Sequence, residues 1–239
     1  MRLHRLPGLR LGMCLFIAWT LGGCSYAPLN IKDSSAPSAQ ARALVRFGNA
    51  QRGGLELEVG QVRGSDVQQL ESGVSTRVGN QTLVGPVTLD HEARLRHYHV
   101  VYNHLLFAGR PVEMEWFAGA EAFRLDWVSR PTAPAQPELR ERRSLWGPTA
   151  GLVGRWNITP LVALEARGGG MATLVGNPSD RGRRGFGELA AVLRPTPGLR
   201  LRAGYAESNA RSWINDLYVD DSMSFKTRGP FLGLAYEWR

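Results

Sequence analysis

Long segments of this chain alternate apolar and polar residues with a period of two. In residues 199–205, leucine, alanine and tyrosine alternate with arginine and glycine, and residues 232–238 repeat the pattern with leucine, tyrosine and tryptophan. Successive side chains of a β-strand point to opposite faces, so this period predicts strands with one apolar and one polar face. No helical apolar stripe of useful length follows residue 24. The sequence therefore predicts an all-β protein.

Eight such segments can be counted. They cover about residues 55–65, 92–104, 112–128, 144–157, 161–174, 185–195, 199–212 and 229–239. The connectors at 103–111, 157–160 and 195–198 are tight, whereas those that begin near Asp66, Arg130, Gly176 and Ser212 are longer and more polar. We therefore expect residues 55–239 to form eight antiparallel strands, joined by short turns at one end and long loops at the other.

The end of the chain resembles the C-terminal insertion signal of outer-membrane β-barrels. Phe231, Gly233, Tyr236 and Trp238 match that signal, although Arg239 follows the last aromatic residue. Such barrels also have short periplasmic turns and longer extracellular loops. Residues 55–239 are thus similar in architecture to the small eight-stranded outer-membrane barrels, a group that includes the transmembrane domain of outer membrane protein A. The resemblance implies a monomeric transmembrane barrel inserted by the barrel-assembly machinery. A soluble sandwich or lipocalin-like barrel would show the same alternation.

The first 23 residues have the composition of a signal peptide. A basic start precedes an apolar run at 11–21, which is shorter than the roughly 20 residues that a membrane-spanning helix needs. The segment Leu21-Gly22-Gly23-Cys24 resembles the lipobox of bacterial lipoproteins. The resemblance implies that Cys24 is lipidated and begins the mature chain, and that Ser25 directs it to the outer membrane. A second cleavage site, after Ala27, stays open.

Residues 24–54 contain prolines and serines and are predicted to form a flexible tether. With an even number of strands, both ends of the barrel would lie on the side of the short turns. We therefore expect the lipid anchor on the periplasmic side of a bacterial outer membrane.

The polar faces of the strands carry acids and bases in similar numbers. The acids are Glu56, Glu58, Glu113, Glu115, Glu121, Glu165, Glu188 and Glu237, and the bases are Arg94, Arg96, Arg155, Arg167, Arg194, Arg200 and Arg202. Unpaired charges are costly in a narrow interior, and an eight-stranded barrel is only wide enough for side chains to fill it. We expect a closed lumen filled by salt bridges; a narrow selective conduit is the alternative.

The formal net charge of +8 is then expected to come mainly from the loops. Arg130, Arg140, Arg142 and Arg143 fall in the second predicted long loop, and Arg181, Arg183 and Arg184 fall in the third. Arginine binds phosphate through paired donors, so these loops could contact lipopolysaccharide phosphates, or they could simply be solvated. Charge that is divided among loops argues against nucleic acid as a partner.

Catalytic and metal-binding motifs are sparse. His97 and His99 would share a strand face, but no third ligand stands at a suitable spacing, so neither a metal nor a cofactor is expected. His91, Asp126 and Ser129 should lie close together at the outer rim, where a serine nucleophile could modify the acyl chains of lipid A. We expect instead a non-enzymatic surface barrel whose loops contact lipopolysaccharide or an external partner, and we keep the lipid A enzyme as an alternative.

Overall fold

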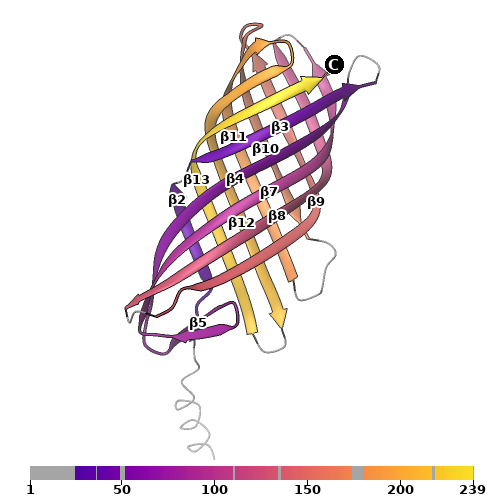
Figure 1. Ribbon diagram of the computed structural model, residues 1–239. Helices are drawn as coiled ribbons and strands as arrows, with labels where there is room; N and C mark the ends of the chain where they lie inside the picture. The colour runs from indigo at the N-terminus through magenta and orange to yellow at the C-terminus, as the bar shows by residue number, and fades with distance from the viewer. Residues whose placement is uncertain are drawn as a thin grey trace, which may run out of the picture.

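The computed structural model describes residues 25–35, 37–48, 52–109, 111–133, 136–173, 180–216 and 219–238. The predicted signal peptide and Cys24 lie outside these residues. Strands make up most of the described chain, and none of its residues form a helix that could cross a membrane. The prediction of an all-β protein is confirmed (Figure 1).

The described residues form thirteen strands. They are β1 (Ser25–Tyr26), β2 (Leu29–Ser35), β3 (Ser38–Phe47), β4 (Gly53–Leu70), β5 (Val74–Val78), β6 (Gln81–Val84), β7 (Val87–Ala108), β8 (Val112–Ala133), β9 (Leu139–Asn157), β10 (Val162–Ala172), β11 (Asp180–Thr196), β12 (Leu199–Asp216) and β13 (Val219–Trp238). Each of the eight predicted segments corresponds to one long strand of this series.

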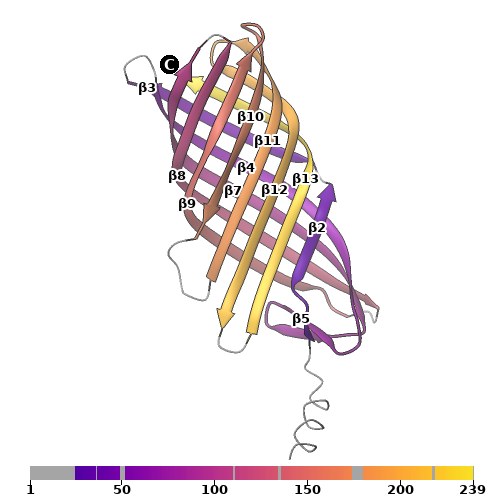
Figure 2. The same cartoon turned by 180° about the vertical axis from the view of Figure 1, so that it is seen from behind.

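The main sheet closes on itself. Its strands follow the order β12-β11-β10-β9-β8-β7-β4-β3-β13-β2, and β12 also pairs with β13. Within the described residues the ring therefore contains nine strands, from β3 through β13 without the β5–β6 hairpin (Figures 1 and 2). Neighbours in the ring are antiparallel except at one seam, where β3 runs parallel to β13 from Ser38 opposite Phe231 to Val45 opposite Trp238. The expected number of eight strands is thus one too few.

The extra strand comes from the segment that was predicted to be a flexible tether. β3 pairs with both β4 and β13, while β2 runs beside an earlier part of β13. Leu29 and Ile31 of β2 are fully buried. The prolines and serines of this segment suggested a linker, but alanines alternate with Gln40 and Arg42 along β3, and that alternation is the strand signal.

An odd number of strands places the two ends of the described chain at opposite ends of the ring. The connectors β7–β8, β9–β10 and β11–β12 are short and lie at the end where the chain finishes, here called the short-turn end (Figure 1). The opposite, long-connector end carries the β5–β6 hairpin, which pairs with β1. The expectation that both ends lie beside the short turns is therefore wrong.

The strands extend well beyond their predicted limits. β7 has 22 residues, which corresponds to ~70 Å of extended chain. Because β12 continues to Asp216 and β13 begins at Val219, the connector that was expected to start near Ser212 is short.

Near the long-connector end the ring has an apolar interior and a polar exterior. Along β7, Leu89 and Leu95 are fully buried inside, whereas the intervening Arg94 and the following Arg96 face outward. Other strands contribute to the same core with Leu29, Ile31, Val62, Phe123, Leu125, Trp127, Leu145, Met171, Ala210, Met223 and Phe225. We call this part of the ring the long-connector half.

In the remaining part, the short-turn half, the polarity is reversed. His97 and His99 of β7 are buried inside, and Tyr98 and Val100 are about half exposed on the outside. The exposed side chains form a band around the ring, the outer apolar band, which includes Val45, Phe47, Leu55, Leu57, Val59, Tyr98, Val100, Tyr102, Met114, Leu152, Trp156, Leu164, Leu189, Leu193, Leu201, Tyr205, Leu232, Leu234, Tyr236 and Trp238. A single strand thus exchanges its inner and outer polarity partway along its length.

The packing of β2 can be tested by truncation. Ile31→Ala should lower the free energy of unfolding by about 2–5 kcal/mol, because it leaves a cavity in the core. Lys32→Ala, at the exposed neighbouring position, should change it by less than about 0.5 kcal/mol. Urea unfolding in detergent measures both; equal, negligible effects would mean that this segment is a tether after all.

Candidate functional site

The interior of the short-turn half is a network of ion pairs. Glu56 and Glu58 of β4 meet Arg42 of β3 and Arg167 of β10: Arg167 Nη1 lies 2.6 Å from Glu56 Oε1, and Arg42 Nη2 lies 2.6 Å from Glu58 Oε2. All four side chains are at least 93% buried. Arg167 also stacks over the ring of Phe117, 4.5 Å from its centroid.

A second group of ion pairs continues the network toward the short-turn end. Arg155 Nη2 lies 2.9 Å from Glu165 Oε2, and Arg202 Nη2 lies 2.8 Å from Glu165 Oε1 and 2.9 Å from Glu188 Oε2. Arg200 pairs with Glu237. Glu115 accepts from both Arg155 and Arg46, and Glu113 and Arg194 lie at the edge of the network. Every carboxylate in this part of the described chain thus faces a guanidinium group.

Four inward arginines were not predicted to lie inside the ring, and two that were predicted there face outward. Arg42 and Arg46 belong to the missed strand β3, while Arg143 and Arg184, expected in loops, lie on β9 and β11 and pair with Glu141 and Glu121. Arg94 and Arg96 face outward because they belong to the part of β7 whose interior is apolar.

The ligand atoms of Glu56, Glu58 and His99 lie close enough together to surround a metal ion. The spacing of His97 and His99 in the sequence had not indicated these two glutamates as further ligands. Their carboxylates, however, already accept from Arg42 and Arg167. The guanidinium groups supply the positive charge that a metal would bring, so we assign no metal here.

Small cavities remain between the ion pairs. One is bounded by Gln40, His97 and Glu188, and another by Arg42, Glu56 and Arg155; each has a volume of about 20 Å³. A cavity of that size holds about one water molecule. These two regions of the interior are filled by side chains.

Loss of one partner should be costly in this network. Arg167→Met leaves Glu56 buried without its closest cation, so we expect a loss of about 3–5 kcal/mol in the free energy of unfolding. Adding Glu56→Gln should recover part of that loss, because the unpaired charge is then absent. Arg181→Met, on the exposed outer face of β11, is the matched control and should have little effect. Equal effects of Arg167→Met and the control would contradict the pairing.

His91 and Ser129 meet inside the long-connector half. His91 Nδ1 lies 2.8 Å from Ser129 Oγ, and His91 Nε2 lies 2.9 Å from Gln68 Oε1. Trp127 Nε1 donates to Ser129 Oγ at 3.1 Å. Both His91 and Ser129 have no exposed surface.

Asp126 does not join this pair. It lies on the outer face of β8, where Arg142 Nε donates to its Oδ1 at 2.7 Å and Arg124 Nε donates at 3.2 Å. Of the serine, histidine and aspartate that were predicted to lie together, only Ser129 and His91 are in contact. Both are buried and have no access to solvent. The error arose because Asp126 and Ser129 are three residues apart, which puts them on opposite faces of a strand.

Burial lowers the pKa of His91 to about 4. The unfolded chain binds a proton at this residue from a pH of about 6.5 downward, whereas the folded protein does so only near pH 4. Stability from neutral His91 is therefore complete above pH 6.5 and is lost as the pH falls toward 4. His91→Gln should flatten the fall in unfolding free energy across this window; an unchanged slope would contradict a buried neutral His91.

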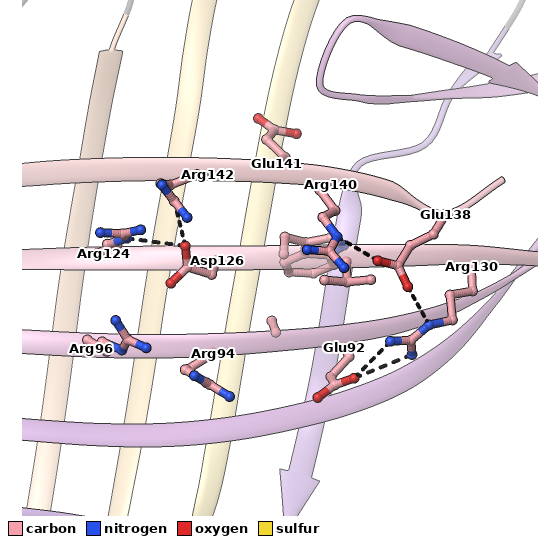
Figure 3. A pocket seen from close by; sticks show the side chains of 13 residues that line it. Glu92, Arg94, Arg96, Arg124, Asp126, Arg130, Glu138, Arg140, Glu141 and Arg142 are labelled. Carbon is pink, nitrogen blue, oxygen red and sulfur yellow. Dashed lines mark hydrogen bonds and ion pairs between the residues drawn. The ribbon is translucent and has the colours of Figure 1, made fainter.

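The outer face of the long-connector half carries a basic groove, shown in Figure 3. It has a volume of about 510 Å³ and crosses β7, β8 and β9. Its charged lining consists of Glu92, Arg94, Arg96, Arg124, Asp126, Arg130, Glu138, Arg140, Glu141 and Arg142.

One end of the groove is balanced by ion pairs. Arg130 donates to Glu92 and Glu138, and Arg140 Nε donates to Glu138 Oε1 at 2.6 Å (Figure 3). The two arginines thus share two acids. The other end differs: within the described residues Arg94 has neither a hydrogen bond nor an ion pair, and Arg96 is bound only by Gln61.

The basic residues that were expected in loops lie on strands instead. Arg130 is on β8, Arg140, Arg142 and Arg143 are on β9, and Arg181, Arg183 and Arg184 are on β11. Arg143 and Arg184 point inward and are buried. These arginines were assigned to loops because they are polar, but the strands are long enough to include them.

The residues of the expected insertion signal lie on β13. Phe231 is buried inside, whereas Tyr236 and Trp238 face outward with their ring centroids 4.4 Å apart. Gly233 lies between them and Phe231, on the inner face opposite Arg202. The residues of this segment thus alternate between the inner and outer faces of β13.

Comparisons with protein-family models and with curated proteins found no match to this chain.

Proposed function

We propose that the protein is a closed β-barrel lipoprotein of a bacterial outer membrane with a non-enzymatic surface role. Its short-turn half would lie in the membrane, and its long-connector half would project from it. The observation that carries the proposal is the reversal of polarity along the strands. An apolar exterior around a charged, paired interior suits lipid, whereas a polar exterior around an apolar core suits water.

The dimensions of the outer apolar band support this assignment. On β7 the band runs from Tyr98 to Phe107, and on β9 it runs from Trp146 to Trp156. Tilted strands need roughly 9–11 residues to cross the hydrocarbon layer. Outward aromatic residues stand at both edges of the band, Tyr98 and Trp146 beside the polarity reversal and Phe107 and Trp156 near the short turns, as in the aromatic girdles of membrane barrels, while Tyr102 lies between the edges.

An arginine placed on the outer apolar band should destabilise the protein in a lipid bilayer. Leu234→Arg, on its outer face, should destabilise the protein in lipid vesicles by ~2–4 kcal/mol at mid-membrane depth. Val67→Arg, at a position that is somewhat more exposed but lies in the long-connector half, should have almost no effect. Folding titrations in phosphatidylcholine vesicles measure both. Equal tolerance of the two arginines would contradict insertion by the short-turn half.

The interior favours a closed barrel over a conduit. The short-turn half is filled by paired charges, and the long-connector half is filled by apolar side chains. An ion that crossed the ring would have to pass both the layer of paired charges and the apolar core. We expect no single-channel conductance in planar bilayers, and steady conductance that shifts with Glu165→Gln would favour the conduit.

The orientation follows from the rule that short turns face the periplasm. The long-connector half, including the β5–β6 hairpin, would then face outward, together with the first described residues. A periplasmic anchor at Cys24 was inferred from an even number of strands, so that reasoning no longer applies; we propose that the chain next to Cys24 lies on the outer side. Ser25–Ala27 contribute contacts to β5, which favours cleavage before Cys24 over cleavage after Ala27.

Epitope insertion tests this orientation. A tag between Gly79 and Asn80 of the hairpin turn should bind antibody on intact cells, and a tag between Pro197 and Gly198 should bind only after the outer membrane is permeabilised. The reverse result would invert the proposed orientation, and no labelling of either tag in an outer-membrane fraction would contradict a surface role for the hairpin.

A further inference from the structure

Three pairs of arginines face each other across neighbouring strands on the outside of the ring. Arg63 lies opposite Arg94 on β4 and β7, Arg96 lies opposite Arg124 on β7 and β8, and Arg183 lies opposite Arg211 on β11 and β12. Like charges directly opposite one another destabilise a sheet. The same unfavourable register on two sides of one ring requires a compensating contact.

The described protein supplies little of that compensation. Arg63, Arg94, Arg183 and Arg211 have no hydrogen bond or ion pair to any residue that the structure describes. Arg96 is held only by the neutral amide of Gln61, with 3.3 Å between Nε and Oε1, and Arg124 shares Asp126 with Arg142. The patch on β4, β7 and β8 thus has a clear excess of positive charge.

The two pairs on β4, β7 and β8 stand close to the edge of the outer apolar band. Arg96 and Arg94 come directly before Tyr98 on the outer face of β7, and Arg63 is separated from Val59 by a single outward residue, Gln61. A membrane whose hydrocarbon layer covers the band would therefore place its head groups at these arginines.

An apolar hollow adjoins the patch. It has a volume of about 470 Å³ and is lined by Ala39, Ala41, Val59 and Tyr98. The short side chains of the two alanines of β3 form its floor. Arg96 lines both this hollow and the basic groove of Figure 3. The guanidinium group of Arg96 therefore lies between the apolar hollow and the cluster of arginine donors.

We propose that this surface binds a phosphorylated lipid. The phosphate would lie between Arg96 and Arg124, with Arg63 and Arg94 beside it, and an acyl chain would occupy the hollow over Ala39 and Ala41. Guanidinium groups form paired, charge-assisted hydrogen bonds with phosphate, which removes the repulsion within each pair. This inference rests on the proposed membrane position of the band.

Native mass spectrometry of the full protein in a neutral detergent tests the inference with bis-phosphorylated lipid A as the probe. The doubly substituted Arg96→Gln/Arg124→Gln protein should bind lipid A at least about tenfold more weakly, because two charged donors are lost. Arg130→Gln/Arg140→Gln is the matched control, since these arginines of the same groove are already neutralised by Glu92 and Glu138; it should retain nearly full affinity.

Further arms separate the possible ligands. Dephosphorylated lipid A should bind poorly, and Ala41→Trp, which fills the hollow, should weaken lipid A binding. Millimolar inorganic phosphate should compete weakly; if it binds as tightly as lipid A, the site is a free-phosphate site and the lipid assignment is wrong. Equal affinity of the two arginine double variants would overturn the proposal altogether. Heat-modifiable gel mobility of each variant shows whether its barrel is folded, so failure here is distinguishable from failure of the membrane assignment.

Discussion

The parallel pairing of β3 with β13 is the interaction on which the rest of the structure depends. Without it, the edges of β3 and β13 would expose a row of unpaired backbone groups, and the sheet would stay open. The pairing also carries Arg42 and Arg46 into the interior, where they bind Glu58 and Glu115. One strand thus closes the ring and supplies two of the cations that pair with its buried acids.

The same pairing determines which end of the ring receives the beginning of the chain. A ring of antiparallel strands alone would have an even number, and its two termini would meet at one end. The parallel seam adds a ninth strand to the described ring, so β1 and the end of β13 are separated by its full height (Figures 1 and 2).

Sequence periodicity was a good guide to the existence of strands and a poor guide to their faces. Alternation identified β7, but a period of two cannot tell inside from outside, and β7 changes polarity between Arg96 and His97. Arg94 and Arg96 were consequently assigned to the interior together with Arg155 and Arg167, which do lie there. The ion-pair partners could not be derived either, because Arg42 lies on the strand that was missed and Arg167 approaches Glu56 from β10, which is distant in sequence.

Local composition was misleading where strands are long and polar. Prolines and serines concealed β2 and β3, and clustered arginines suggested loops where β8, β9 and β11 continue. Strands that leave an apolar environment and enter water can carry arginine outward at no cost, so polarity no longer marks their ends. The His91–Ser129 contact was found because β7 and β8 are joined by a short turn, from which the pairing could be counted to the far ends of both strands.

The central claim is that the outer surface changes from lipid-facing to water-facing partway along each strand. Single cysteines at Arg94 and at Val100, six residues apart on the outer face of β7, test it most directly. In vesicles that contain the folded protein, a membrane-impermeant maleimide, located by peptide mass spectrometry, should label Arg94→Cys rapidly and leave Val100→Cys unmodified; in detergent-free urea both should react. Equal labelling of the two positions in vesicles would contradict the account.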